Sequence, residues 1–325
     1  MSTATMTLAA RRFRDSMAMP LALGLILFVV GAYLIDGFAS VRTVKAVLVL
    51  ASFVGLASIG QTLVIVMGGI DLSVPFLVGF ANVVAAKGFE AGLPDPMVII
   101  IAVGLTASIG ALNGFLSRRF GVHPLIITLG VGTTAVAAVL WWTAGFPTGS
   151  APDWVTGFVS IGASTGPIEL PPMVLFWAVL TVCIVIVERS TVYGRRLFAL
   201  GSNPRSAEIA LVRPLRMWVA TFAVSGAFAG LTGVLFLGFT GSASGTVGDP
   251  LLFQTIAAVV VGGTSLIGGL GGYARTVVGA IVLILLSTLL LGLGVSSSLI
   301  QVALGALIIV LVSVYGREAR MRDRI

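Results

Sequence analysis

Asp71 is the side chain in this sequence whose position most suggests chemistry. It is the only charged residue between Ala46 and Ala86, in a stretch that is otherwise apolar or uncharged. A carboxylate near hydrocarbon costs a few kcal/mol unless it meets water, a helix start or a polar partner. Two roles fit this position. The carboxylate could satisfy free backbone N–H groups where a helix begins, or it could lie at a helix break that lines a solute path.

The composition of the chain explains why a single carboxylate is conspicuous. Its 325 residues are 58% hydrophobic and 10% charged, whereas an ordinary soluble domain has about 25% charged residues. Apolar runs of about 17–25 residues, each able to cross a hydrocarbon core about 30 Å thick, recur along the chain. We therefore predict an all-α membrane protein, a polytopic bundle of about ten transmembrane helices, at 20–36, 44–67, 70–87, 96–117, 123–144, 171–188, 216–240, 251–268, 271–291 and 296–314.

The basic residues orient this bundle. Of the 19 lysines and arginines, Arg42, Lys45 and Lys87 fall on one predicted side, and the other 16 fall on the side of both termini. Basic residues concentrate in cytoplasmic loops, so we predict that both termini are cytoplasmic and that Asp71 lies near a cytoplasmic turn. The chain then divides into a cytoplasmic tail (1–19), a membrane domain (20–316) and a second cytoplasmic tail (317–325). No nucleic-acid partner is expected, because no soluble domain carries clustered basic and aromatic residues.

The other reactive side chains do not form a catalytic or metal site. Ser244 would need a histidine base within reach, but the single histidine, His123, is expected on the opposite side of the membrane. The single cysteine, Cys183, has no partner for a disulfide or a thiolate metal site. The glycine-rich segment 262–272 lacks the lysine of a phosphate-binding loop. We therefore expect a chain that is not an enzyme and that carries no metal and no cofactor.

The longest loop on the predicted cytoplasmic side is 188–215. Asn203 can cap a helix that begins at Pro204, and Pro214 stops it, which predicts a short helix over 204–213. Its small and apolar residues alternate with charges, a pattern that suits docking into the groove of a partner protein. A solvated connecting helix is the alternative.

Uncharged polar residues inside the predicted spans could supply hydrogen bonds to a neutral solute. Alternatively, they hydrogen-bond between helices, as polar residues in membrane bundles often do. Together with Asp71, these path candidates are Gln61, Thr62, Asn82, Asn113, Thr128 and Gln254. Two glycine pairs are predicted to form tight turns with close helix contacts, Gly68 with Gly69 and Gly262 with Gly263.

Four segments carry a family resemblance. They are "GGIDLSV" (68–74), "GVHPLIITLG" (121–130), "YGRRLFALGSNPRSAEIALV" (193–212) and "IAAVVVGGTSLIGGLGG" (256–272). In order and spacing, over roughly residues 40–316, they resemble permease subunits of bacterial ABC importers of the ribose, xylose and galactose type. The sequence departs from the family pattern at Pro75 and Leu211, where glycine is usual, and at 252–254, where acidic residues are common.

The resemblance implies a permease in the bacterial inner membrane that translocates a monosaccharide or related polyol in an ATP-driven importer. It implies three partners: a cytosolic ABC ATPase that carries ATP and Mg²⁺, a periplasmic solute-binding protein, and a second permease, either an identical copy or a homologue. Positions resembling the segment that couples to the ATPase are Gly201, Asn203, Pro204, Arg205, Ala207, Glu208 and Ala210.

The alternative function is a stand-alone secondary transporter or channel for a small polar solute, driven by an ion gradient. Ion coupling usually leaves paired charges inside the membrane. Asp71 stands nearly alone within the predicted spans, which favours the ATP-driven importer.

Overall fold

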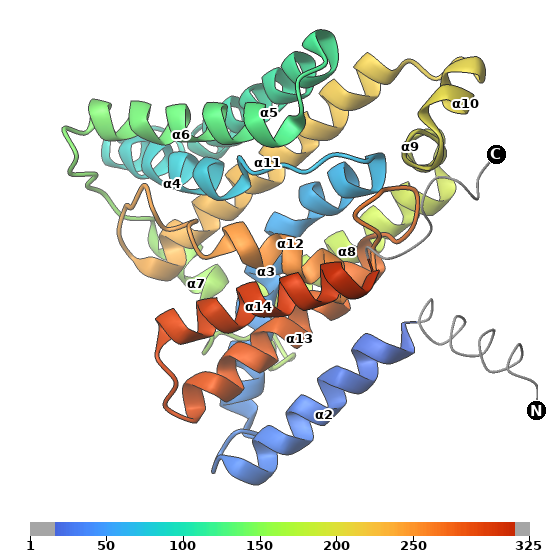
Figure 1. Cartoon of the computed structure of the whole chain (residues 1–325). Coiled ribbons are helices and arrows are strands. Elements are labelled where there is room, and N and C mark those ends of the chain that lie inside the picture. Colours follow the sequence, from blue (N-terminus) through green and yellow to red (C-terminus); the bar gives the residue numbers. More distant parts are fainter. Residues whose placement is uncertain (1–16, 316–325) are drawn as a thin grey trace, which may run out of the picture.

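The computed structural model describes residues 17–315, and all regular elements in that range are helices (Figure 1). Position 317 onward and most of the predicted tail 1–19 lie outside the described residues. The helices are α2 (Ala18–Leu34), α3 (Val41–Met67), α4 (Val74–Glu90), α5 (Asp95–Phe120), α6 (Pro124–Trp142), α7 (Asp153–Val159), α8 (Pro172–Ser190), α9 (Val192–Ser202), α10 (Pro204–Ile209), α11 (Pro214–Thr240), α12 (Leu251–Val261), α13 (Tyr273–Gly292) and α14 (Ser297–Tyr315).

The all-α prediction is confirmed over the described residues, and each predicted span has a helical counterpart there. Within residues 17–315, six helices are long and apolar enough to cross a membrane: α3, α5, α6, α8, α11 and α13. Shorter apolar helices are α2, α12 and the stretch Ser297–Leu307 of α14. The predicted span 251–268 is too long, because α12 ends at Val261 and a glycine-rich turn follows it. The total of ten transmembrane helices stays a prediction.

Proline and glycine set many of the helix limits. Pro124, Pro172 and Pro214 each occupy the first turn of a helix, where the missing N–H costs no hydrogen bond. Gly121 and Gly241 end α5 and α11 with φ of 67° and 75°, in the left-handed region that glycine adopts without strain. The boundaries between helices therefore follow from local backbone chemistry.

The centre of the bundle is formed by α3 and α11. Every residue of α3 from Ala51 to Met67 is buried, as expected for a helix that is apolar on all sides. On α11, Ser225 packs directly on Gly60 of α3, where a Cβ atom would lie 2.2 Å from the Ser225 Cα atom. Small residues allow this approach because they let two helix backbones meet. The outer helices pack around this closely joined pair.

The connecting helices mark the two ends of the bundle. The short helices α9 and α10 lie at one end, together with the start of α2 and the end of α14 (Figure 1). The helix α7 lies at the opposite end (Figure 1). Figure 1 also shows an extended segment that leaves the end of α3 and runs back into the bundle to the start of α4.

Candidate functional site

The segment 68–73, here called the first link, carries Asp71 into the interior of the bundle. The link begins at Gly68, whose φ of 95° turns the chain back at the end of α3. The carboxylate of Asp71 then meets Ser225, the residue that packs on Gly60 of α3. Gly60 lies seven positions before the end of α3, or about 10 Å at 1.5 Å per residue. Asp71 therefore lies well inside the bundle, and its predicted place near a turn at the edge is wrong.

The Asp71 carboxylate collects donors from the link itself and from α11. One oxygen accepts the backbone N–H of Ser73 at 2.9 Å and the Ser73 hydroxyl at 2.5 Å. The other oxygen accepts the Ser225 hydroxyl at 2.7 Å, and the Asn113 amide donates to the Ser73 hydroxyl at 2.9 Å. Asp71 is only 1% exposed. This polar cluster therefore joins the first link to α5 and α11.

The polar cluster also provides hydrogen-bond partners for the non-helical backbone of the first link. Non-helical backbone inside a membrane bundle must find hydrogen-bond partners within the protein. Asp71 accepts the N–H of Ser73, and the Thr128 hydroxyl of α6 accepts the N–H of Leu72 at 2.9 Å. Ser73 is the residue before α4, and Pro75 occupies the first turn of that helix. Asp71 thus holds the residue that starts α4 without bonding the N–H groups of its first turn.

A second non-helical segment, built largely of turns, enters the bundle from the other end. Residues 241–250, here called the second link, connect α11 to α12. The Asn82 side chain accepts the N–H of Ser244 at 2.8 Å. Further along, a Cβ atom at Gly248 would lie 2.0 Å from the Pro75 carbonyl oxygen. The second link therefore runs back along α4, and α12 begins beside the start of α4.

The loop between α8 and α11 starts its second helix as predicted. The Asn203 side chain accepts the N–H of Ser206 at 3.0 Å, and Pro204 opens α10. The predicted end at 213 is wrong, because α10 ends at Ile209. Leu211 takes φ 59°, a left-handed conformation in which the chain cannot continue the helix. This is the position at which the family usually has glycine.

Exposure divides the residues of the α10 segment into two groups. Ala207 is buried at 3% exposure, and its carbonyl accepts the N–H of Val212 at 3.1 Å. Arg205 and Ala210 are exposed. The large apolar side chains of Ile209 and Leu211 are 79% and 86% exposed. Ala207 therefore belongs to the buried core, and the free apolar surface comes from the residues that follow it.

An ion pair connects α10 to the end of α5. The guanidinium of Arg118 donates to the Glu208 carboxylate at 2.6 Å, and both side chains are partly exposed. Such surface pairs contribute little to stability, at most about 1 kcal/mol. The pair connects α10, by one side-chain contact, to a helix that also carries Asn113 of the polar cluster.

Glycines join the end of α9 to the end of α3. A Cβ atom at Gly201 would lie 1.9 Å from the Val66 carbonyl oxygen and 2.6 Å from the Gly269 nitrogen. The same Gly269 N–H donates to Val66 at 2.8 Å. The end of α9 therefore packs, backbone against backbone, beside the first link.

The predicted turn glycines play different structural roles. Gly68 and Gly263 take left-handed conformations, with φ of 95° and 87°. Gly262 ends α12 in a helical conformation and allows a close approach, because its Cβ atom would lie 2.3 Å from the Arg275 carbonyl oxygen. Gly69 follows Gly68 in the first link, and its N–H donates to the Val64 carbonyl of α3 at 2.9 Å.

The remaining path candidates lie in different surroundings. The Thr62 hydroxyl of α3 hydrogen-bonds Thr276 of α13 at 2.9 Å. The Gln61 amide is fully buried and has no hydrogen-bond partner among the described residues. Gln254 of α12 lines a cavity. Thr62, like most of the others, is thus committed to contacts within the protein.

Several residues of this arrangement have no counterpart among the sequence candidates. Ser73 and Ser225 complete the polar cluster, and the only sequence signal for Ser225 is its place among small residues of α11. Glu188 of α8 is 4% exposed, and its carboxylate accepts the N–H of Tyr273 at the start of α13. The Tyr273 hydroxyl in turn donates to Gly55 of α3 at 3.0 Å. These contacts fix α8 and α13 against α3.

Long apolar helices, joined by non-helical links that side chains hold in place, are typical of a multi-pass membrane protein. The chain belongs to the family described as branched-chain amino acid transport system / permease component, whose model matches residues 43–317. This membership confirms the resemblance to permease subunits of ABC importers. In this class the chain is a transport subunit and not an enzyme, and ATP hydrolysis takes place on a separate chain.

Curated relatives cover most of the chain. It is 32% identical over 292 residues to the probable ABC transporter permease protein YphD of Escherichia coli K12, covering 88% of this chain and 85% of that protein. It is 31% identical to the fructose import permease protein FrcC of Rhizobium meliloti, covering 90% and 82% of the two chains. Identity is 29% to the autoinducer 2 import system permease protein LsrD of Salmonella typhi, covering 80% and 79%. No solved structure matches the chain.

Proposed function

We propose that this permease translocates a monosaccharide or related polyol across the bacterial inner membrane, after a periplasmic binding protein delivers it. The observation that carries this proposal is the similarity, over 90% of the chain, to a permease named for fructose import. The neutral polar residues of the bundle agree with such a solute, because sugar hydroxyls need donors and acceptors and no counter-ion.

In the proposed orientation, the end of the bundle with α9 and α10 faces the cytoplasm. Arg118, Arg195 and Arg213 lie in or beside these helices, whereas Arg42 and Lys87 belong to helix ends on the opposite side. Basic residues concentrate in cytoplasmic loops. Ten membrane crossings then place both termini in the cytoplasm.

The proposed cytoplasmic partner is an ABC ATPase, which supplies ATP and Mg²⁺ on its own chain. Ile209 and Leu211 offer it exposed apolar side chains at the tip of the loop. A left-handed conformation costs a residue with a side chain about 1–2 kcal/mol relative to its usual backbone. Leu211 adopts this unfavourable conformation and its side chain is exposed to solvent, which supports a docking role. The importer is completed by a second permease, an identical copy or a homologue.

Uptake in reconstituted vesicles tests the proposed function. Vesicles are reconstituted with the permease, its ATPase and the binding protein, and are tested with labelled D-fructose, D-ribose, D-xylose and D-galactose. They should accumulate at least one of these sugars, and only when ATP is present on the side of the membrane that carries the ATPase. A catalytically dead ATPase should abolish this uptake. Uptake driven by a proton or sodium gradient without the ATPase would show that the proposal is wrong.

Substituting Ile209 with aspartate should release the ATPase. An unpaired carboxylate buried in an apolar contact is costly, so we expect the amount of ATPase that co-purifies with the permease to fall at least about tenfold, which corresponds to 1.4 kcal/mol. Leu211→Gly should also weaken co-purification, although glycine relieves the left-handed backbone. Val192→Asp is the control, because it places the same charge at an exposed position on the first turn of α9. Unchanged co-purification with Ile209→Asp would exclude α10 as the docking site.

A further inference from the structure

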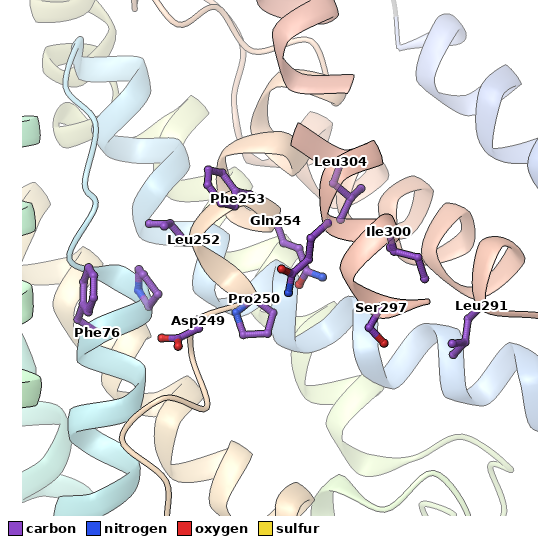
Figure 2. A pocket seen from close by; sticks show the side chains of 12 residues that line it. Phe76, Asp249, Pro250, Leu252, Phe253, Gln254, Leu291, Ser297, Ile300 and Leu304 are labelled. Carbon is purple, nitrogen blue, oxygen red and sulfur yellow. The ribbon is translucent and has the colours of Figure 1, made fainter. Parts of the chain in front are cut away.

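A cavity of about 570 Å³ lies beside the starts of α4 and α12 (Figure 2). The first turn of α4 contributes Phe76, and the start of α12 contributes Asp249 and Gln254. On the other side, α14 contributes Ser297 and Gln301. Figure 2 shows Gln254 between α12 and the helix that carries Ile300 and Leu304. The volume is in the range of small-molecule sites, about 300–1,000 Å³.

The polar side chains of this cavity have no hydrogen-bond partner among the described residues, unlike those that hold the two links. Asp71, Asn82 and Thr128 all hydrogen-bond other parts of the chain. The side chains of Asp249, Gln254, Ser297 and Gln301 form no hydrogen bond with another residue in 17–315. Three of these four residues are exposed and Gln254 is half-buried, so their side chains can reach a molecule in the cavity. Four polar side chains around one cavity, without a partner in that part of the chain, therefore indicate a place that a polar molecule can occupy.

The lining also restricts the chemistry of the occupant. Each glutamine amide can donate and accept, the Ser297 hydroxyl can do both, and the Asp249 carboxylate accepts. Among residues 17–315, no lysine, arginine or histidine lines the cavity, so this part of the chain offers an anion no counter-charge. Phe76 and Phe253 supply apolar ring surface beside these polar groups. A neutral solute with several hydroxyl groups matches this mixture of donors, acceptors and apolar faces.

We propose that this cavity is the binding position of a neutral polyhydroxylated solute during its passage, with Gln254 and Gln301 as its direct hydrogen-bonding ligands. The inference rests on the proposed sugar import and assigns a position to it. The first link reaches the start of α4 from one end of the bundle, and the second link reaches the start of α12 from the other. The cavity beside both helix starts therefore lies between the two ends of the bundle.

Cysteine labelling tests the cavity independently of transport. The single native cysteine, Cys183, is exposed, so Cys183→Ala provides a background without thiols. Into it we would introduce Gln254→Cys, Gln301→Cys and the control Thr255→Cys, a neighbour on α12 that is 1% exposed. A water-soluble methanethiosulfonate should label Gln254→Cys and Gln301→Cys and leave Thr255→Cys unmodified. At least one of D-fructose, D-ribose, D-xylose and D-galactose should slow this labelling, and potassium gluconate, an anionic relative, should not.

Uptake kinetics provide the second readout. Replacing Gln254 with leucine removes one neutral hydrogen bond, which corresponds to a loss of about two- to tenfold in the efficiency of ATP-driven sugar uptake. The loss should appear in the KM for the loaded binding protein or in the maximal rate, while the ATPase still co-purifies in full. Gln254→Asn, which keeps the amide, should recover part of the uptake.

Three outcomes would overturn the proposal. One is absent labelling at both glutamine positions, and another is labelling that no sugar of the panel slows. The third is a disulfide between Gln301→Cys residues of two permease copies without sugar protection, which would assign these amides to a contact between subunits. If the wild-type importer shows no ATP-driven sugar uptake but labelling is sugar-protected, the ATP-driven mechanism is wrong and the binding position stands.

Discussion

Replacing Asp71 with alanine is expected to yield little folded protein and no measurable uptake. The substitution leaves three buried donors without an acceptor: the Ser73 N–H, the Ser73 hydroxyl and the Ser225 hydroxyl. Each unpaired buried donor costs about 1–3 kcal/mol, so a total loss of at least about 3 kcal/mol is expected. Proteins are stable by only about 5–15 kcal/mol. Monodisperse yield after detergent extraction and the Tm of the purified protein measure this loss.

Asp71→Asn separates the structural role of this residue from a role in the solute path. The asparagine oxygen can accept from Ser73, and its amino group can donate to the Ser225 hydroxyl, which is able to accept. We therefore expect near wild-type yield, with uptake largely retained, because Asp71 is buried and fully engaged. A folded Asp71→Asn protein without uptake would instead show that the charge itself serves transport. Normal yield and Tm for Asp71→Ala would contradict the structural role.

Gly201→Leu is expected to abolish ATP-driven uptake while α3 and the rest of the membrane bundle remain folded. Even a Cβ atom at this position would lie 1.9 Å from the Val66 carbonyl oxygen, so α9 must move away from the end of α3. Overpacking of this kind typically costs about 1–3 kcal/mol. The displacement alters the position of α10, which follows one residue after α9. The uptake rate and the amount of co-purified ATPase measure the effect, and Gly201→Ala should give a smaller loss of both.

Gly130→Ala is the matched control for this substitution. Gly130 also lies in a helix, but an added Cβ atom there meets nothing within 4 Å. Alanine should therefore leave uptake and co-purification unchanged, with a slight gain in helix propensity. If Gly201→Leu behaves like Gly130→Ala, the contact between α9 and α3 does not carry the signal from the ATPase to the bundle.

The sequence predicts the helices of this protein well and its short elements poorly. Apolar runs of membrane-spanning length are a strong signal, and each predicted span has a helical counterpart. The helices α7 and α9 have no such signal, since each is short and lies in a polar connection. The end of α10 is missed because it depends on Leu211 taking a backbone conformation that its residue type disfavours.

The depth of Asp71 inside the bundle cannot be predicted from the distribution of basic residues along the sequence. The distribution of arginines locates loops relative to a membrane, but a chain that turns back after Gly68 enters the bundle without changing that distribution. The sequence shows which residues are polar, whereas their hydrogen-bond partners depend on tertiary packing. Thr128 bonds a backbone N–H 56 positions away, and Asn82 bonds one 162 positions away. Gln254 was also found by type, but its exposure to a cavity depends on α14.

The two links also determine which parts of the bundle yield most easily. Bending α3 or α11, each 27 residues long, would strain an unbroken ladder of backbone hydrogen bonds. At the links that ladder is already open, and a few side-chain hydrogen bonds hold the chain in its place. A displacement of α9 would act on the first link through the Val66 carbonyl, two residues before Gly68. We therefore expect any change in the shape of the bundle to begin at the two links, and the cavity lies beside the helices that follow them.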